Sequence, residues 1–185
     1  MKLGFYGGTF DPIHHGHLIL AREAVETLGL DRLYFIPNAT SPHKTNTVAA
    51  PATLRAEMIR AAIENEPRFD LDDLELTRSG VSYTIDTVLS LRERFGAKAT
   101  FFYLIGEDNV SSLASWRRID ELHHLATFVV LCRSEHPTPL PYVTLQRRID
   151  ISATEIRKRI ANGQSIRYLV PDKVHDLIIS NSLYR

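Results

Sequence analysis

Short apolar runs and amphipathic stretches alternate along this chain. Apolar residues that recur every three or four positions are typical of a helix with one buried face, and short continuous apolar runs are typical of buried strands. The runs predict strands at residues 2–6, 32–37, 73–77 (a short strand or edge segment), 99–105 and 127–131. The amphipathic stretches predict helices at residues 16–28, 51–65, 84–95, from 109 through Trp116 to about 125, from 153 to about 163, and 172–179.

Capping residues and loop-forming segments mark where these elements begin and end. The spacing Ser152-Ala-Thr-Glu155 has the form of a capping box, which predicts that Ser152 is the N-cap of a helix ending near Gly163. Pro51 and Pro171 suit the first turn of the helices that follow them. The remaining segments are expected to be loops or short links: residues 38–50, 134–142 and 148–151.

The order of the expected elements indicates the fold class. Repeated strand–helix units are typical of an α/β domain with a mostly parallel, doubly wound sheet. A length of 185 residues suits one such domain, which we expect to span residues 1–185. Ligands of these folds bind beyond the carboxyl ends of the strands, where the strand order reverses. Three turns follow expected strands and should therefore lie at one edge of the sheet: residues 7–17, 41–44 and 106–108.

Composition and charge exclude several classes of protein. Hydrophobic residues make up 44% of the chain and charged residues 24%, as in ordinary globular proteins. Basic and acidic residues both number 22, whereas a general nucleic-acid binder would need a basic excess. No apolar run approaches the roughly 20 residues of a membrane span, and no signal peptide precedes the first expected strand. We therefore expect a cytoplasmic protein without membrane or nucleic-acid partners, and the sequence leaves open whether it forms a homodimer.

The most informative chemistry lies in one segment, which reads Leu3-Gly-Phe-Tyr-Gly-Gly-Thr-Phe-Asp-Pro-Ile-His-His-Gly-His17. Its glycines let backbone N–H groups approach a ligand, and the next helix has a partial positive charge at its N-terminus. His14 and His17 can donate hydrogen bonds to phosphate oxygens there, so the segment predicts an anion site. A zinc hydrolase using His14, His15 and His17 is an alternative, because imidazole binds zinc. It is disfavoured since adjacent histidines on a tight turn point apart and no carboxylate base is spaced with them.

Two common nucleotide motifs are absent from the sequence. The chain has no G-x-x-x-x-G-K-[ST] segment, which disfavours a P-loop kinase or NTPase, and no G-x-G-x-x-G after the first strand, which disfavours a nicotinamide dehydrogenase. The pattern that is present, Gly-Thr-Phe-Asp-Pro-Ile-His-His-Gly-His, resembles the signature of the nucleotidyltransferase superfamily with a His-x-Gly-His motif.

A second segment resembles another motif of the same superfamily. It reads Ile151-Ser-Ala-Thr-Glu-Ile-Arg157, close to the family pattern Ile-Ser-Ser/Ala-Thr-x-Ile-Arg. Ser152 and Thr154 stand at a helix N-terminus, where hydroxyl and free N–H groups can bind the β- and γ-phosphates of ATP. Arg157 lies one turn further along and can place its guanidinium on the same oxygens.

Further segments are similar to the bacterial nicotinate-nucleotide adenylyltransferase family: Ser41-Pro-His-Lys44, Ser82-Tyr-Thr84-Ile-Asp-Thr87, Gly106-x-Asp108 and Trp116. That family has a Rossmann-like nucleotidyltransferase fold. Its members join nicotinate mononucleotide to the AMP part of ATP and release pyrophosphate, a step of NAD synthesis. The resemblance implies an adenylyltransferase with ATP and nicotinate mononucleotide as its ligands.

The same resemblance implies roles for individual residues. The ATP site would be lined by Gly8, Thr9, Phe10, His14, His17, Gly106, Asp108, Ser152, Thr154 and Arg157. Catalysis would depend on His14, His17 and Arg157, with His17 nearest the α-phosphate. The mononucleotide would meet Lys44 at its phosphate, Asp108 at a ribose hydroxyl, Thr84 at the ring carboxylate and Trp116 on the ring face. Arg117 and Arg118 follow Trp116 where many members carry a second aromatic, so a sandwich of the ring between two aromatics is an open question.

The implied reaction is in-line attack by a mononucleotide phosphate oxygen on the α-phosphorus of ATP. A phosphate monoester is already ionised at neutral pH, so no general base is required. Positioning and charge neutralisation would supply the catalysis. Mg2+ is expected to accompany ATP, held mainly by phosphate oxygens and water, and no protein metal site is expected.

Several alternatives stay open at this point. Another adenylyltransferase of the superfamily would use nicotinamide mononucleotide or pantetheine phosphate as the acceptor. Chains of the pantetheine phosphate branch tend to be shorter and to lack the Pro-His-Lys and Ser-Tyr-Thr segments. A nucleotide sensor without activity is disfavoured because the phosphate-contacting residues of both motifs are present.

Overall fold

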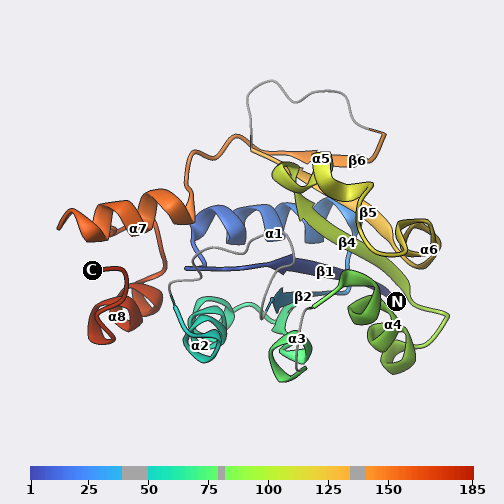
Figure 1. Cartoon of the computed structure of the whole chain (residues 1–185), viewed down its shortest axis with the longest axis horizontal. Coiled ribbons are helices and arrows are strands. Elements are labelled where there is room, and N and C mark those ends of the chain that lie inside the picture. Colours follow the sequence, from blue (N-terminus) through green and yellow to red (C-terminus); the bar gives the residue numbers. More distant parts are fainter. Residues whose placement is uncertain (39–49, 79–81, 134–140) are drawn as a thin grey trace.

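A six-stranded sheet forms the centre of the computed structural model, which describes residues 1–38, 50–78, 82–133 and 141–185 (Figure 1). Its strands are β1 (Lys2–Gly8), β2 (Arg32–Pro37), β3 (Phe69–Leu71), β4 (Thr100–Gly106), β5 (Thr127–Cys132) and β6 (Val143–Gln146). All neighbouring strands pair in parallel, in the order β3-β2-β1-β4-β5-β6. The expected doubly wound parallel sheet is therefore confirmed.

The strand order reverses beside β1. The chain runs outward from β1 through β2 to β3 and then returns to place β4 on the other side of β1. Gly8 at the end of β1 is in register with Pro37 of β2, while Tyr6 is in register with Leu104 of β4. Connections that diverge from β1 and β4 in this way leave a crevice at the carboxyl ends of these strands, which is where α/β folds bind ligands.

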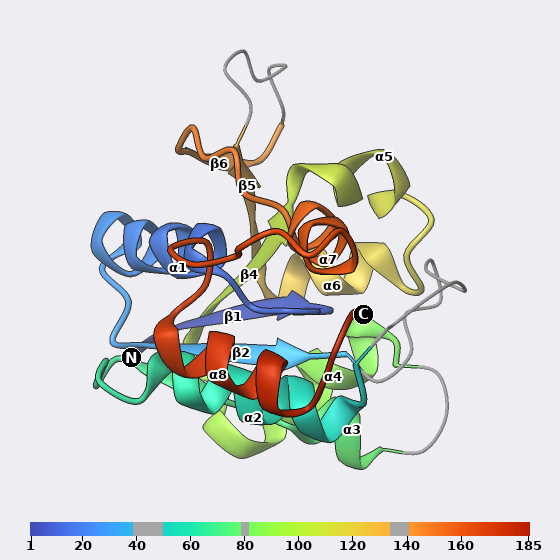
Figure 2. The same cartoon turned by 90° about the vertical axis from the view of Figure 1, so that its left-hand side faces the viewer.

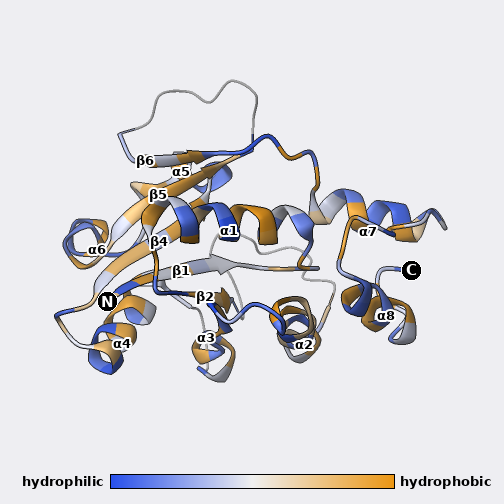
Figure 3. Ribbon diagram, turned by 180° about the vertical axis from the view of Figure 1, so that it is seen from behind, coloured by the Kyte–Doolittle hydropathy of each residue, from blue (hydrophilic) through white to orange (hydrophobic). Residues whose placement is uncertain are grey.

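Helices cover both faces of the sheet. They are α1 (His15–Leu28), α2 (Ala52–Ile63), α3 (Leu74–Thr77), α4 (Thr84–Phe95), the 3-10 helix η1 (Glu107–Asn109), α5 (Val110–Leu113), α6 (Ile119–Leu125), α7 (Ala153–Ala161) and α8 (Asp172–Ser180). Side chains of α1, α2, α7 and α8 share one buried cluster with one face of the strands, and those of α4, α5 and α6 share a second with the other face. Hydrophobic and hydrophilic residues alternate along α1 and α7, as expected of helices with one buried side (Figure 3).

Several predicted boundaries agree with the structure. The strand Arg32–Pro37 and the helix Thr84–Phe95 have the bounds that the hydrophobic pattern indicates. Ser152 is the N-cap of α7, and its hydroxyl accepts a hydrogen bond from the backbone N–H of Glu155 at 3.1 Å. Gly96 ends α4 with a φ of 77°, a conformation that costs little for glycine alone. Pro51 and Pro171, expected in the first turns of these helices, lie one residue earlier, at the N-caps of α2 and α8.

The strand expected at residues 73–77 is wrong, because Leu74–Thr77 forms the short helix α3. The carboxylate of Asp72 accepts a hydrogen bond from the N–H of Leu74 at 3.2 Å, and the carbonyl of Asp73 accepts one from Leu76 at 2.9 Å. These bonds start a helical turn, which places Glu75 in the interior. The strand of this region lies earlier, at Phe69–Leu71, where the chain reaches the edge of β2.

The single helix expected between residues 109 and 125 is also wrong. The segment contains η1, α5 and α6, with a break from 114 to 118. The N–H of Trp116 donates to the carbonyl of Leu113 at 3.0 Å, and Arg118 has a φ of 56°. A left-handed residue cannot continue a helix, so the chain changes direction immediately after Trp116.

Strand β6 is absent from the sequence prediction, which assigns no element to residues 143–147. Val143–Gln146 pairs with β5 along its length, although only Leu145 of this strand is buried. Most of the expected loops at 38–50 and 134–142 lie outside the described residues. No helix in the described ranges has the length and apolar character needed to cross a bilayer.

Candidate active site

Two adjoining cavities lie at the carboxyl ends of β1 and β4. The larger cavity has a volume of about 370 Å³ and is lined by Tyr6, Gly7, Gly8, Thr9, Phe10, Asp11, His14, His17, Asn38, Gly106, Asp108, Asn109, Arg133, Ser152, Ala153, Thr154 and Arg157. The smaller cavity has a volume of about 110 Å³ and is lined by Gly7, Gly8, Thr9, Ile36, Asn38, Glu75, Ser82, Tyr83, Thr84, Tyr103, Ile105, Asn109, Trp116 and Arg117. Gly7, Gly8, Thr9, Asn38 and Asn109 line both cavities, so the two cavities adjoin one another.

The structure brings together the residues that the resemblance groups around ATP. All ten line the larger cavity, although they come from β1, α1, β4, α7 and the turns between them. Thr84 and Trp116, expected at the mononucleotide, line the smaller cavity instead. Asp108, expected at both ligands, lines the larger cavity only. Lys44, with the rest of the Ser41–Lys44 segment, lies outside the described residues.

Glycines at the end of β1 are required by close contacts. A Cβ atom on Gly7 would lie 2.6 Å from the hydroxyl oxygen of Tyr103, and one on Gly8 would lie 2.9 Å from the ring of Phe10. Both distances are below those that side chains tolerate. The wall that the two cavities share is therefore formed here by backbone rather than by side chains.

His14 and His17 form a compact pair where α1 begins. The backbone N–H of His14 donates to Nδ1 of His17 at 3.3 Å, and the two rings stack. His14 is only 1% exposed. Its burial, with smaller effects from the charges of Arg133 and His15, lowers the pKa of His14 to about 3. The ring of His14 is therefore neutral at pH 7, while the half-buried His17 lies beside it at the cavity.

The N-terminus of α7 forms another wall of the larger cavity. Ser152, Thr154 and Arg157 all line it. Nη1 of Arg157 donates to the backbone carbonyl of Asp11 at 2.7 Å, and its Nη2 lies 3.3 Å from Oγ1 of Thr154. The guanidinium is thus held between the glycine–histidine loop and its own helix, in a position suited to an anion that enters at the helix N-terminus.

The carboxyl end of β4 supplies the acidic group of the site. Asp108 folds over Gly106 so closely that a Cβ on Gly106 would collide with Oδ1 of Asp108. Nδ2 of Asn109 donates to the same oxygen at 3.1 Å. The carboxylate is held at the rim of the larger cavity, where it can accept hydrogen bonds from sugar hydroxyls.

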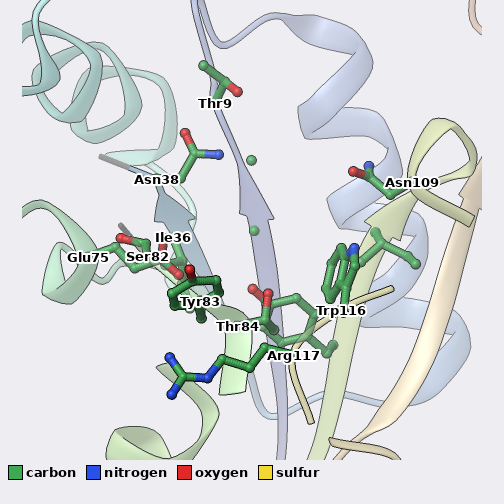
Figure 4. A pocket seen from close by; sticks show the side chains of 14 residues that line it. Thr9, Ile36, Asn38, Glu75, Ser82, Tyr83, Thr84, Asn109, Trp116 and Arg117 are labelled. Carbon is green, nitrogen blue, oxygen red and sulfur yellow. The ribbon is translucent and has the colours of Figure 1, made fainter. Parts of the chain in front are cut away.

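The smaller cavity combines aromatic, polar and charged groups. Trp116 lies on one side of it, and Tyr83 and Thr84 lie on the other (Figure 4). The guanidinium of Arg117 lies over the ring of Tyr83, with its carbon 4.9 Å from the ring centroid. A planar ring bound here would meet one aromatic face from Trp116 and a cation from Arg117 nearby.

A buried carboxyl group also borders the smaller cavity. Glu75 of α3 accepts a hydrogen bond from the hydroxyl of Thr87 at 2.7 Å. Burial raises the pKa of Glu75 and so favours its neutral form, although the bond from Thr87 opposes this. The group therefore carries less negative charge toward the cavity than an exposed glutamate would.

Sequence reasoning missed several residues that line the cavities. Arg133 borders the larger cavity directly after β5, and its Nη1 donates to the carbonyl of Ile151 at 3.0 Å. Asn38 and Asn109 follow β2 and β4 and border both cavities. The sequence signal that could have identified these residues is their position just beyond the end of a strand. Among the described residues, no three His, Cys, Asp or Glu side chains converge closely enough to hold a metal ion.

Known proteins are similar to this chain in sequence. A family model described as cytidylyltransferase-like matches residues 5–159. A probable nicotinate-nucleotide adenylyltransferase of Geobacillus thermodenitrificans is 41% identical over 99% of this chain and 86% of its own length. The nicotinate-nucleotide adenylyltransferase of Bacillus subtilis is 39% identical over 99% of this chain and 98% of its own length.

Solved structures share the fold. The Plasmodium falciparum nicotinic acid mononucleotide adenylyltransferase complexed with NaAD superimposes with a TM-score of 0.81 over 99% of this chain and 97% of that chain, at 22% identity. The same enzyme complexed with APC gives a TM-score of 0.78 at 21% identity. These similarities agree with the fold described above.

Proposed function

Because this chain belongs to the nicotinate-nucleotide adenylyltransferase family, we propose that it transfers the adenylyl group of ATP to nicotinate mononucleotide. The products are nicotinate adenine dinucleotide and pyrophosphate. The observation that carries the proposal is the pair of adjoining cavities at the carboxyl ends of β1 and β4. One is bordered by cationic and helix-terminal groups suited to a triphosphate, and the other by groups suited to an aromatic ring.

ATP would occupy the larger cavity. Its β- and γ-phosphates would meet the N-terminus of α7 with Ser152, Thr154 and Arg157, where N–H, hydroxyl and guanidinium donors gather. The α-phosphate would meet His17, with the neutral ring of His14 packed behind it. Backbone groups of Gly8, Thr9 and Phe10 would border the reacting phosphates, and Asp108 with Gly106 would border a ribose.

The reaction needs one bond to form and one to break. An oxygen of the mononucleotide phosphate attacks the α-phosphorus of ATP, and the bond from that phosphorus to the β-phosphate oxygen breaks, so that pyrophosphate leaves. The attacking phosphate is already ionised at neutral pH, so no proton needs to be removed. The protein contributes alignment of the two ligands across the shared wall and neutralisation of charge on the α-phosphate and the leaving group.

Mg2+ would arrive bound to the ATP phosphates. The side chains bordering the larger cavity are mainly hydrogen-bond donors, with Asp11 and Asp108 as its acidic members. Such a donor set suits a metal held chiefly by phosphate oxygens and water rather than by a protein cage. A cytoplasmic location, where ATP is abundant, accompanies this proposal.

Nicotinate mononucleotide would occupy the smaller cavity. Trp116 would stack on the pyridine ring, and Thr84 with its neighbouring amides would meet the ring carboxylate. Arg117 adds a cation near that carboxylate, and the raised pKa of the buried Glu75 lessens the repulsion between Glu75 and the carboxylate. Asp108, at the rim of the larger cavity, would accept a hydrogen bond from the ribose of the mononucleotide, and Lys44 is proposed to neutralise its phosphate. A neutral nicotinamide ring would leave such donors without an anion, which favours the acid over the amide.

One assay tests the proposed function. Pyrophosphate release is measured by a coupled assay with ATP, Mg2+ and either nicotinate mononucleotide, nicotinamide mononucleotide or pantetheine phosphate. We expect a kcat/KM for the nicotinate substrate that exceeds that for the nicotinamide substrate by roughly a hundredfold or more. Equal values for the two mononucleotides would contradict the acid preference. Turnover with pantetheine phosphate alone, or ATP binding without any turnover, would contradict the proposal as a whole.

A further inference from the structure

Tyr184, the penultimate residue, contacts the loop that carries the histidines. Its hydroxyl donates a hydrogen bond to Oδ1 of Asp11 at 2.7 Å, across 173 positions of sequence. Asp11 lines the larger cavity and is only 3% exposed. Figure 2 shows the C-terminus beside the carboxyl ends of β1 and β2, so the chain end lies next to the site.

The tail after α8 adopts an uncommon backbone path to reach this position. Ser182 has a φ of 51° and Tyr184 a φ of 65°, both in the left-handed region that disfavours side chains other than glycine. The N–H of Leu183 donates to the carbonyl of Ile178 at 3.0 Å, and the Tyr184 ring packs against the core cluster. Backbone of this kind persists where surrounding contacts hold it in place.

The loop from 9 to 11 is held by three separate elements. Arg55 of α2, only 1% exposed, donates from Nη1 to the carbonyl of Thr9 at 2.7 Å. Arg157 of α7 donates to the carbonyl of Asp11 at 2.7 Å, and Tyr184 donates to the Asp11 side chain. Phe10, between the two held residues, has a φ of 49°. Asp11 is therefore the one residue of this loop that joins the chain end to a guanidinium of the larger cavity.

We infer that Tyr184 is a positioning residue of the ATP site, acting through Asp11 on Arg157 and the histidine loop. The inference rests on the proposed function and adds to it a residue that touches neither cavity. Removing the hydroxyl takes away one hydrogen bond of the Asp11 carboxylate, which also accepts a hydrogen bond from the N–H of Ala50 at 3.2 Å. The carbonyl of Asp11 then loses a fixed position, and Arg157 with it.

The expected effect is specific to ATP. Asp11 and Arg157 line the larger cavity and not the smaller one. Trp116, Thr84 and Arg117, at the smaller cavity, come from α4 and the α5–α6 break and share none of the contacts described for Tyr184. Burial together with the neighbouring Asp11 also raises the pKa of Tyr184, so its hydroxyl keeps its proton and remains a donor throughout the assay range.

The test compares Tyr184→Phe with Tyr168→Phe. Both changes remove one hydroxyl, but the Tyr168 side chain is 78% exposed and lines neither cavity. We measure KM for each substrate, kcat and the urea midpoint of unfolding. Tyr184→Phe should lower kcat/KM for ATP about tenfold, the order expected for one charge-assisted hydrogen bond, and leave KM for the mononucleotide within twofold. Tyr168→Phe should leave every value unchanged.

A double-mutant cycle with Arg157→Lys tests the route of the effect. If Tyr184 acts through Arg157, the combined loss in kcat/KM is smaller than the product of the single losses. Losses that multiply, equal losses for both substrates, or Tyr184→Phe kinetics that match wild type would each overturn the inference. If wild type shows no adenylyl transfer, the proposed function fails. Calorimetry with ATP then decides the inference separately: weaker binding by Tyr184→Phe supports it, and equal binding overturns it.

Discussion

The imidazole rings of His14 and His17 stack with their centroids 3.7 Å apart and their planes inclined by 23°. Two protonated rings at this distance would repel each other. Burial of His14 removes that conflict, because it keeps this ring neutral while the ring of His17 borders the cavity. His14 is therefore the buried ring that supports the pair, and His17 is the ring that can contact an anion in the cavity.

Replacing His17 with Ala should reduce kcat by about 10²–10³, because one donor to developing phosphate charge has an effect of this size. Steady-state kinetics with both substrates measure the loss. His175→Ala on α8, which lines neither cavity, is the matched control and should retain wild-type turnover. Near-normal kcat in a folded His17→Ala protein would remove His17 from the proposed chemistry.

The stability of the protein should fall as pH decreases from 7 to 5. The unfolded chain binds a proton at His14 with a pKa near 6.5, whereas the folded chain resists protonation until about pH 3. Because the unfolded state binds more protons in this window, His14 alone should lower the unfolding free energy by about 2 kcal/mol at pH 5.

Urea unfolding of wild type and His14→Gln at several pH values isolates this contribution. Glutamine does not titrate, so the variant should lose about 2 kcal/mol less between pH 7 and 5, whatever its stability at pH 7. Parallel pH curves for the two proteins would show that His14 is not held in its neutral form.

Replacing Trp116 with Ala should raise KM for nicotinate mononucleotide up to about tenfold, as expected for loss of one aromatic stacking partner. KM for ATP should stay nearly unchanged, since Trp116 borders only the smaller cavity. Trp116→Phe keeps a ring and should recover most of the affinity. A larger effect on ATP than on the mononucleotide would reverse the proposed assignment of the two cavities.

Replacing Arg117 with Gln should reduce the preference for nicotinate over nicotinamide mononucleotide by about tenfold, because a partly exposed cation near the carboxylate is lost. Arg118→Gln provides the control. Arg118 forms an ion pair with Glu121 on α6 and borders neither cavity. If both variants change the ratio of specificity constants equally, general surface charge rather than Arg117 sets the preference.

Much of the sheet could be predicted from the sequence because its central strands are buried on both faces. The continuous apolar runs of β2, β4 and β5 identify these segments as buried strands and fix where they lie in the sequence. Strand β6 carries no such run, because it lies at the edge and most of its side chains are exposed. Residues 73–77 alternate as a strand would, but so short a stretch cannot distinguish a strand from one helical turn.

The site residues also divide into those that the sequence predicts and those that it does not. His14, His17, Ser152 and Arg157 could be predicted to meet, because they stand in two motifs that resemble those of one nucleotidyltransferase superfamily. The bond from Tyr184 to Asp11 could not, because it depends on a tail path through left-handed residues that no local pattern indicates. Arg133 is a single cation after an ordinary buried strand, and only the sheet order brings it to His14.

The shared wall of Gly7 and Gly8 has a consequence for inhibitor design. No side chain on these residues divides one cavity from the other, so a single molecule with two arms could lie across both without displacing either glycine. Such a bisubstrate compound would gain affinity from tethering, since its second arm binds at a high local concentration once the first is seated. A linker about as long as the two phosphates of a dinucleotide is the natural starting length.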